Sequence, residues 1–268
     1  MSDTSETLST DNDRYTVPAL ERGLRLLACF TPSQPVWSAP DLARTLALPR
    51  STVFRMLTTL EGMGYLQRSG TEYRLGLAVL RLGYDYLSTQ PLAQLAEPVL
   101  QSLCDRLGFT TNLALLDGTS VVYVARIAPA GAFQGAVRVG SRLPAHATVL
   151  GRALLQDMDA DQLRALFGGS ELPQFSESTP RSVEQLLQLL QQDHERGYAM
   201  GEGFYEPGVS SIAAPVRDAQ GRIVAGLGMA VAFTEIAPGR MADWVEQVRA
   251  AADELAGHLR TQHPGFLR

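Results

Sequence analysis

The chain has 268 residues, which is long enough for two compact domains or one large one. Apolar residues make up 45% and charged residues 19% of it, a composition typical of a folded globular protein that excludes disordered, collagenous and disulfide-stapled chains. No apolar run approaches the roughly 18 to 20 residues that span a bilayer, and the polar, acidic N-terminus does not resemble a signal peptide. We therefore expect a cytoplasmic protein without a membrane partner.

The net charge of −5 is unevenly distributed along the chain. Residues 1–13 carry four acidic residues and no basic one, and we expect them to form a disordered acidic tail. Residues 14–84 carry nine arginines against four acidic residues. A basic segment inside an acidic chain is typical of a nucleic-acid-binding domain, because neutralised phosphates supply most of the binding energy.

Motifs of catalysis and metal binding are missing from the sequence. It has no GxSxG elbow, HExxH motif or Walker loop, and its four histidines are scattered. The two cysteines, Cys29 and Cys104, lack CxxC spacing and are expected in the core. We therefore expect neither a metal nor a cofactor, and no enzyme activity.

Three helices are predicted in the basic segment. Apolar residues recur at spacings of three and four over Pro18–Phe30, and two further helices are expected at about Ala39–Leu46 and Arg50–Met63. Only the tight turn 47–49 separates the last two, which is the pattern of a helix-turn-helix.

The polar face of the third helix is suited to reading DNA. It carries Arg50, Ser51, Thr52 and Arg55 on its first turn and a half, where a recognition helix contacts base edges and phosphates. Residues 65–68 and 72–75 alternate like the strands of a hairpin, which predicts a wing. From the wing, Arg68 and Arg74 are expected to meet flanking phosphates or the minor groove.

Two stretches carry a family resemblance. Residues 38–83 read SAPDLARTLALPRSTVFRMLTTLEGMGYLQRSGTEYRLGLAVLRLG, and residues 195–231 read ERGYAMGEGFYEPGVSSIAAPVRDAQGRIVAGLGMAV. The first resembles the winged helix-turn-helix of the IclR family of bacterial transcriptional regulators, and the second resembles the effector-domain signature of that family. The resemblance implies a regulator that binds a double-stranded DNA operator in the bacterial nucleoid under the control of a small organic acid.

The resemblance also implies an α+β architecture in which an N-terminal winged helix-turn-helix is followed by a C-terminal GAF-like effector-binding domain with a curved antiparallel sheet. The domains are expected at 14–76 and 91–262, joined by a linker helix at 77–90. The residue pattern agrees on its own, because strands alternate with helices throughout the second domain. Strands are expected at 111–116, 121–127, 213–217 and 223–231, and helices at 92–107, 149–155, 160–167, 183–196 and 241–259.

Effector contacts are carried over from the family residue by residue. They fall on Val149, Leu150, Gly201, Val209, Ser211, Gly228 and Ala230. The chain departs from the family pattern at Gly201-Glu202-Gly203-Phe204, where many members have an Asp-Asp-Glu-Glu run, and at Gly228 and Ala230, where serines are often found. The lost hydroxyls add space for a ligand. Residues 123–155 also look more like the branch of the family that controls protocatechuate and 4-hydroxybenzoate catabolism. We therefore expect the effector to be an aromatic carboxylate. A small aliphatic oxo-acid is the alternative.

Several polar side chains are candidates for holding the acid. Arginine forks match carboxylates, and histidine exchanges hydrogen bonds with a ring hydroxyl. The alternative for each is an ordinary solvated arginine or a packed loop histidine. The candidates are Arg126, Arg138, Arg142 and His146, with Glu202 and Glu206 as further acidic residues and the backbone N–H groups near Thr148 at a helix start.

Two other classes of function stay open on the sequence alone: a small-molecule hydrolase or transferase that carries a helix-turn-helix, and a DNA-binding protein that acts through protein partners without a small ligand. A homodimer or tetramer is expected, because helix-turn-helix proteins generally read two half-sites. Leu20, Leu24 and Leu27 either supply part of that contact or belong to the domain core.

Overall fold

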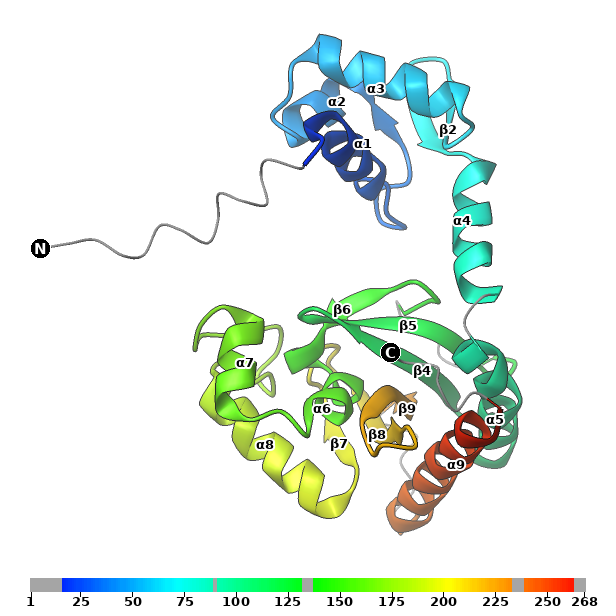
Figure 1. Cartoon of the computed structure of the whole chain (residues 1–268), viewed down its shortest axis with the longest axis vertical. Helices are drawn as coiled ribbons and strands as arrows, with labels where there is room; N and C mark the ends of the chain where they lie inside the picture. The colour runs from blue at the N-terminus through cyan, green and yellow to red at the C-terminus, as the bar shows by residue number, and fades with distance from the viewer. Residues whose placement is uncertain (1–15, 89–90, 132–136, 233–238, 263–268) are drawn as a thin grey trace, which may run out of the picture. The chain divides into compact units, whose positions relative to one another are not determined.

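The computed structural model describes residues 16–88, 91–131, 137–232 and 239–262. The chain divides into one unit that ends at Tyr86 and another that begins at Leu87 (Figure 1). The acidic tail expected at residues 1–13 lies outside the described residues. No helix within the described ranges combines the length and the apolar character needed to cross a membrane.

The N-terminal unit is a helix-turn-helix followed by a β-hairpin. A three-stranded sheet has the order β1-β3-β2, with both pairs antiparallel. Strand β1 has two residues, too few for a sequence pattern to reveal. The elements are α1 (Pro18–Ala28), β1 (Trp37–Ser38), α2 (Ala39–Thr45), α3 (Arg50–Gly62), β2 (Leu66–Ser69), β3 (Glu72–Leu75) and α4 (Leu77–Ser88).

Local chemistry fixes the helix-turn-helix. The Ser38 hydroxyl accepts the backbone N–H of Asp41 at 3.3 Å and caps α2. In the turn, Ala47 has φ +52°, a left-handed conformation that glycine adopts at lower cost. Leu42 of α2 and Val53 of α3 are fully buried in the core of this unit. These contacts set the crossing of α2 and α3.

Helix α1 buries only part of its apolar surface. Leu26 and Phe30 join the core, and Leu27 packs partly against it. The side chains of Leu20 and Leu24 remain about 60% exposed. Of the two alternatives that the sequence leaves open, core membership is therefore wrong for Leu20 and Leu24, because Leu26 and Phe30 are the residues through which this segment joins the core.

The C-terminal unit is built on a six-stranded antiparallel sheet with the order β6-β5-β4-β9-β8-β7. The short strands β6 and β7 are absent from the sequence prediction, which treats both segments as loops. The strands are β4 (Thr110–Asp117), β5 (Ser120–Ile127), β6 (Arg142–Pro144), β7 (Ala199–Glu202), β8 (Val209–Arg217) and β9 (Ile223–Ala232). The helices are α5 (Pro91–Leu107), the 3₁₀ turn η2 (Ala145–Ala147), α6 (Val149–Leu155), α7 (Ala160–Phe167), α8 (Val183–Arg196) and α9 (Met241–Gln262).

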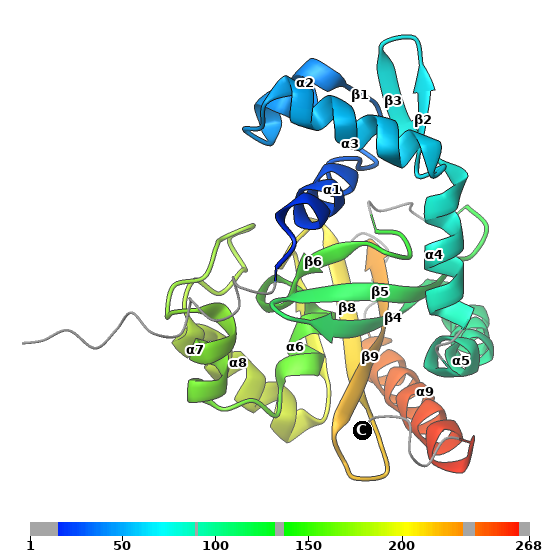
Figure 2. The ribbon, with the colours of Figure 1, turned by 45° about the horizontal axis from the view of Figure 1, so that its top comes forward.

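Helices cover both faces of this sheet (Figures 1 and 2). Helices α5 and α9 pack on one face, where side chains such as Leu113 and Leu227 form one buried core. Helices α6, α7 and α8 belong to a second core on the other face, with Ala114 and Ala213 from the sheet. Alternate residues of the strands face the two cores, as strand geometry requires, except where a β-bulge interrupts the pairing. The expected α+β fold class is confirmed.

Candidate functional site

A cavity of about 330 Å³ lies on the α6 side of the sheet. Its size is within the range of small-molecule sites. Its walls are chiefly apolar and aromatic, with a few polar groups among them. The residues of the central strands that line it are Thr110, Asn112, Tyr123, Arg126, Ser211 and Ala230, and those opposite them include Val149, Leu150, Phe204, Tyr205 and Glu206.

A β-bulge in β5 brings two polar residues to the cavity. In the pairing of β4 with β5, Leu113 lies opposite Ala125 and Ala114 opposite Tyr123, so Val124 is an extra residue. Strict alternation would place Tyr123 and Arg126 on opposite faces of the sheet. The bulge resets the alternation, and both side chains line the cavity.

Arg126 is the candidate counter-ion for an acid. Its side chain is half-buried, and its Nε is fully buried without a hydrogen-bond partner among the described residues. Burial lowers the pKa of Arg126, and the neighbouring charge of Arg138 lowers it further. A guanidinium nevertheless stays protonated in proteins, so the cavity contains a cation with an unused donor.

Two uncharged polar side chains lie beside Arg126. Asn112, opposite Arg126 on β4, is only 5% exposed, and its Oδ1 has no hydrogen-bond partner in the described parts of the chain. Burial raises the pKa of Tyr123 to about 12, so its phenol remains neutral and able to donate. Sequence reasoning missed both residues; the signal for Asn112 was an amide side chain next to the apolar run Leu113–Leu116 of the same strand.

Aromatic rings form the opposite wall. Phe204 lies over Gly201, where a Cβ would come within 2.3 Å of the ring, so glycine is needed for this approach. The backbone oxygen of Phe204 accepts hydrogen bonds from the hydroxyls of Thr179 at 2.5 Å and Ser176 at 3.0 Å. The next residue, Tyr205, packs on Phe175 with 5.4 Å between ring centroids. Both cavity rings are therefore held by the loop that precedes α8.

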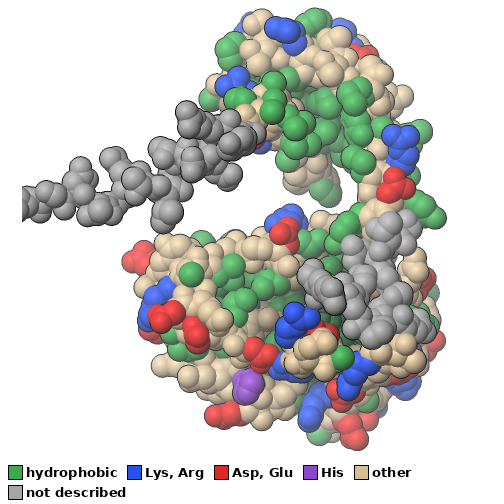
Figure 3. Space-filling model, viewed as in Figure 1, with side chains coloured by type: hydrophobic (Ala, Val, Ile, Leu, Met, Phe, Trp, Pro, Cys, Tyr) green, Lys and Arg blue, Asp and Glu red, His purple; other side chains and the backbone are tan. Residues whose placement is uncertain are grey.

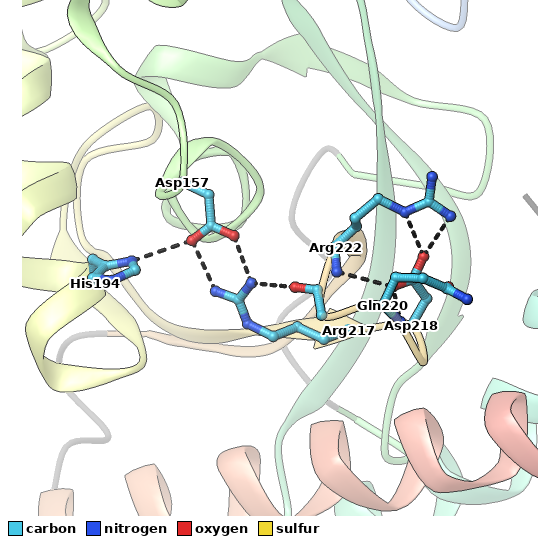
Figure 4. A network of polar contacts seen from close by, with 7 residues as sticks. Asp157, His194, Arg217, Asp218, Gln220 and Arg222 are labelled. Atoms are coloured by element: carbon cyan, nitrogen blue, oxygen red, sulfur yellow. Dashed lines mark hydrogen bonds and ion pairs between the residues drawn. The ribbon is translucent and has the colours of Figure 1, made fainter.

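Helix α6 is fixed to the rest of the unit at both ends. The Thr148 hydroxyl accepts the Gly151 N–H at 3.0 Å and caps its start. Arg152, fully buried, donates two hydrogen bonds of 2.7 Å to Asp193 of α8, and its guanidinium lies 4.7 Å from the Phe204 ring centroid. Just beyond the helix, Asp157 pairs with Arg217, at the end of β8, and with His194 (Figure 4).

Six of the residues carried over from the family line the cavity: Val149, Leu150, Gly201, Val209, Ser211 and Ala230. Arg126 and Glu206, which are candidates by residue type, line it too.

Gly228 does not line the cavity. A Cβ at this position would lie 2.5 Å from the backbone oxygen of Ile212 and 3.0 Å from the Cβ of Ala213. Glycine is therefore required for the close approach of β8 to β9. The expectation that Gly228 adds space for the ligand is corrected accordingly.

Four of the polar candidates also lie outside the cavity lining: Arg138, Arg142, His146 and Glu202. Arg142 is exposed and pairs with Asp117, at the far end of β4. Arg138 is exposed, and its guanidinium donates to the backbone oxygen of Val137 at 2.8 Å. The structure thus favours Arg126 over both as the cation of the cavity.

His146 does not line the cavity, although its Nδ1 is buried without a hydrogen-bond partner among the described residues. It is buried, its Nε2 donates to the backbone oxygen of Pro173 at 2.8 Å, and its ring packs against Phe167 and Phe175. Burial lowers the pKa of His146, while the hydrogen bond to Pro173 raises it.

The N-terminal unit presents the expected polar face. Arg50, Ser51 and Arg55 of α3 are exposed, and Thr52 is half-buried. No acidic residue lies in the first turn of α3, and no side chain caps its start. Phe54, which the sequence analysis did not single out, is 54% exposed on the same helix, where an apolar side chain could contact a thymine methyl group.

The wing carries its arginines on the outside. Arg68 and Arg74 are both exposed and lie in adjacent strands of the hairpin, β2 and β3. The Arg68 Nε donates to the backbone oxygen of Gly70 at 2.8 Å, and its guanidinium lies 5.8 Å from the Tyr73 ring centroid. The hairpin turn therefore orients Arg68 without neutralising its charge.

A winged helix-turn-helix in one unit and a ligand-sized cavity in the other define a class of protein: a DNA-binding regulator that responds to a small molecule. Residues 19–70 match the model of the IclR helix-turn-helix domain, and residues 84–256 match that of the bacterial transcriptional regulator IclR C-terminal domain. The chain belongs to the IclR family of transcriptional regulators.

Similar proteins agree with this assignment. The HTH-type transcriptional regulator XynR of Escherichia coli is 31% identical over 245 residues, 91% of this chain and 97% of the relative. The Pca regulon regulatory protein of Pseudomonas putida is 35% identical over 212 residues, 79% of this chain and 73% of the relative. The crystal structure of an IclR homolog complexed with 4-hydroxybenzoate, from Microbacterium hydrocarbonoxydans, has a TM-score of 0.77 and 27% identity, covering 91% of this chain and all of that one.

Proposed function

We propose that this regulator responds to an aromatic carboxylate that binds in the cavity with its carboxylate group on Arg126. The observation that carries the proposal is the half-buried guanidinium whose Nε has no partner among the described residues. A carboxylate would accept from that donor, and a hydrogen bond to a charged group is among the stronger ones in proteins.

The ring-lined wall favours an aromatic acid over an aliphatic one. Tyr123, Phe204 and Tyr205 line the cavity and offer faces and edges against which a ligand ring packs. An acid as small as glyoxylate would leave these rings without a partner. The complex of the Microbacterium homolog with 4-hydroxybenzoate supports this choice, as does the similarity to the Pca regulon regulatory protein.

A thermal-shift series on the purified full chain tests the ligand class. We expect protocatechuate or 4-hydroxybenzoate to raise the melting temperature, because a ligand held only by the folded state stabilises it by about 2.7 kcal/mol at one hundred times its Kd. Phenylacetate, in which a methylene group separates the carboxylate from the ring, tests whether the two must be joined directly. A shift with pyruvate or glyoxylate alone would contradict the aromatic proposal. If none of the acids raises the melting temperature, the proposal of a carboxylate ligand is contradicted altogether.

For DNA, we propose that Arg50, Ser51, Thr52 and Arg55 enter the major groove and that Arg68 and Arg74 contact flanking phosphates or the minor groove. The exposure of the arginines supports this. An operator selected from random DNA provides the probe. Arg55→Ala should weaken operator binding by about 1 to 3 kcal/mol and relax specificity, whereas Arg74→Ala should weaken binding to all sequences and reduce the salt slope by about one. Unchanged affinity and salt slope in Arg55→Ala would remove this residue from the interface.

We further propose a homodimer, or a tetramer of two such dimers, that uses the exposed apolar face of α1. Val17, Leu20 and Leu24 share one helical face, and hydrophobic side chains gather on the surface of the N-terminal unit (Figure 3). A twofold-symmetric pair would present two recognition helices to two half-sites. Sedimentation should show Leu24→Asp shifted toward monomer and Arg22→Asp, on the other face of α1, unchanged. An assembly that survives Leu24→Asp would contradict this interface.

Effector binding changes operator affinity only if the ligand binds two states of the regulator with different affinities. We therefore expect an acid that raises the melting temperature also to change the operator Kd. Titration of the operator with and without the acid measures this coupling.

A further inference from the structure

We propose that Asn112 is a specificity-determining residue that accepts a hydrogen bond from a hydroxyl group of the effector, so that the cavity selects hydroxylated acids over their unhydroxylated parents. This inference rests on the proposed function, since it assumes that an acid occupies the cavity. It adds a second recognition point, with a chemical requirement of its own, to the carboxylate site at Arg126.

The unpartnered oxygen of Asn112 is the first observation. The side chain is 5% exposed and lines the cavity, and Oδ1 is buried without a hydrogen-bond partner among the residues that the structure describes. Buried polar atoms in folded proteins are almost always satisfied, so an exception in a ligand-sized cavity points to a group supplied from outside.

The neighbours of Asn112 in the sheet do not satisfy it. Arg126 lies opposite it on β5 and Gly228 on β9. Gly228 has no side chain to offer. Arg126 has an unpartnered donor of its own, yet its Nε and the Asn112 Oδ1 are both left without a bond. Cross-strand neighbours with an unused donor and an unused acceptor are complementary to a ligand that presents both an acceptor and a donor.

The next residue on β4 shows that unsatisfied polar atoms are not a general feature of this strand. Thr111 faces the other side of the sheet and is fully buried, and its hydroxyl donates to the backbone oxygen of Leu100 in α5 at 3.0 Å. Two consecutive buried polar side chains thus differ in one respect. The satisfied one faces the core between the sheet and α5, and the unsatisfied one faces the cavity.

The chemistry of the two atoms assigns their partners. A carboxylate only accepts hydrogen bonds, so it suits the Arg126 N–H and offers no donor to the Asn112 oxygen. A cationic amine would donate to Asn112 but would be repelled by the guanidinium beside it. A neutral hydroxyl donates to Asn112 without a charge conflict. A hydroxy acid therefore matches the pair.

Calorimetric titration of the full chain tests the inference with matched ligands: benzoate, the three monohydroxybenzoates and the corresponding fluorobenzoates, in which fluorine replaces hydroxyl without a donor. The wild type should bind at least one hydroxybenzoate about tenfold more tightly than benzoate and than the matching fluorobenzoate. Asn112→Leu should lose this preference while Arg126 still holds the carboxylate. Asn112→Ala, which introduces no bulkier side chain into the cavity, should lose it as well.

The ligand-free proteins provide a readout that a merely structural role would not give. Asn112→Leu removes a buried unsatisfied acceptor and should melt at a higher temperature than the wild type. Thr111→Val removes a satisfied hydroxyl from the same strand, so it should melt no higher than the wild type and should keep the preference for hydroxylated acids.

The inference is overturned if both Asn112 variants keep the preference, if the ligand-free Asn112→Leu protein melts lower than the wild type, or if the wild type binds benzoate and all hydroxybenzoates equally. In the last case the proposed aromatic carboxylate still stands. If no acid binds the wild type, the proposed function fails and this inference fails with it.

Discussion

Two arginines of the C-terminal unit, one at the floor of the cavity and one where α6 meets α8, have opposite environments. Arg152 is fully buried, and its fork donates two hydrogen bonds of 2.7 Å to Asp193. Arg126 is half-buried, pairs with no acidic residue in the described parts of the chain, and keeps an unpartnered Nε. The first arginine is satisfied by the fold, and the second keeps a donor that the described residues leave unused.

The two arginines differ in burial and, above all, in their partners: Arg152 has a buried acidic partner, and Arg126 has none in the described parts of the chain. Leaving a buried donor unsatisfied costs free energy, and folded proteins keep few such groups. The pairing of Arg152 with Asp193 stabilises the position of α6, and the packing of its guanidinium on Phe204 extends that support to the cavity wall. Arg126, which has no ion-pair partner among the described residues, supplies no such support.

The largest expected effect is on the structural side of this comparison. Arg152→Leu leaves the fully buried Asp193 with Arg196 as its remaining ion-pair partner among the described residues, so we expect a loss of about 3 kcal/mol in the free energy of unfolding. Chemical denaturation measures it. The double variant Arg152→Leu/Asp193→Leu should recover part of the loss, and a single variant as stable as the wild type would contradict the structural role.

A smaller effect is expected where the two regions meet. Gly201→Ala places a methyl group against the Phe204 ring, which must move away from the Arg152 guanidinium. We expect about 1 to 3 kcal/mol of destabilisation from this overpacking, together with a changed affinity for aromatic acids. Gly221→Ala serves as the control, because its position in the β8–β9 turn has left-handed strain but no contact with the cavity. It should leave ligand affinity unchanged.

A third arginine, Arg217, forms an ion pair at the surface, and the contribution of this pair to stability depends on pH. Its hydrogen bond to Asp157 is the main cause that holds the pKa of this carboxyl below its ordinary value of 3.8 (Figure 4). Because the folded-state pKa is the lower one, the stabilisation is present above about pH 4 and is lost as the pH falls through the folded pKa. The pair is partly exposed, so we expect under about 1 kcal/mol. The difference in free energy of unfolding between the wild type and Asp157→Asn should therefore become smaller as the pH is lowered. A difference that does not change with pH would contradict this role of the pair.

The smallest effect is expected at Arg142, which the sequence suggested as a ligand. Its pair with Asp117 is solvent-exposed on both sides, and such pairs contribute little. Arg142→Ala should change the free energy of unfolding by less than about 0.5 kcal/mol and the affinity for aromatic acids by less than about twofold. A large loss of affinity would show that Arg142 reaches the ligand after all.

The helices were the most predictable part of the fold. The bounds expected for residues 149–155, 160–167 and 183–196 are confirmed. Local chemistry explains the success: Asp159 and Ser182 cap two of these helices, and Gly168 and Gly197 end them in the left-handed conformation. The short strands β1, β6 and β7 were missed, because two to four residues give no reliable alternation and their pairing depends on distant partners.

The cavity was predictable only in part. The family positions on α6, β7, β8 and β9 identified much of its lining, since they follow from an alignment of the motif. The roles of the arginines depended on partners far away in the sequence, such as Asp117 for Arg142. The bulge at Val124, which places Arg126 in the cavity beside Tyr123, leaves no mark on a pattern of period two.

The central claim is that Arg126 holds the carboxylate of an aromatic effector, and titration calorimetry of 4-hydroxybenzoate or protocatechuate into the wild type and Arg126→Leu tests it most directly. The account predicts that the wild type binds, that Arg126→Leu loses about tenfold to a hundredfold in affinity, and that its ligand-free stability is equal to or above that of the wild type. Equal affinities of the two proteins for the acid would contradict the account.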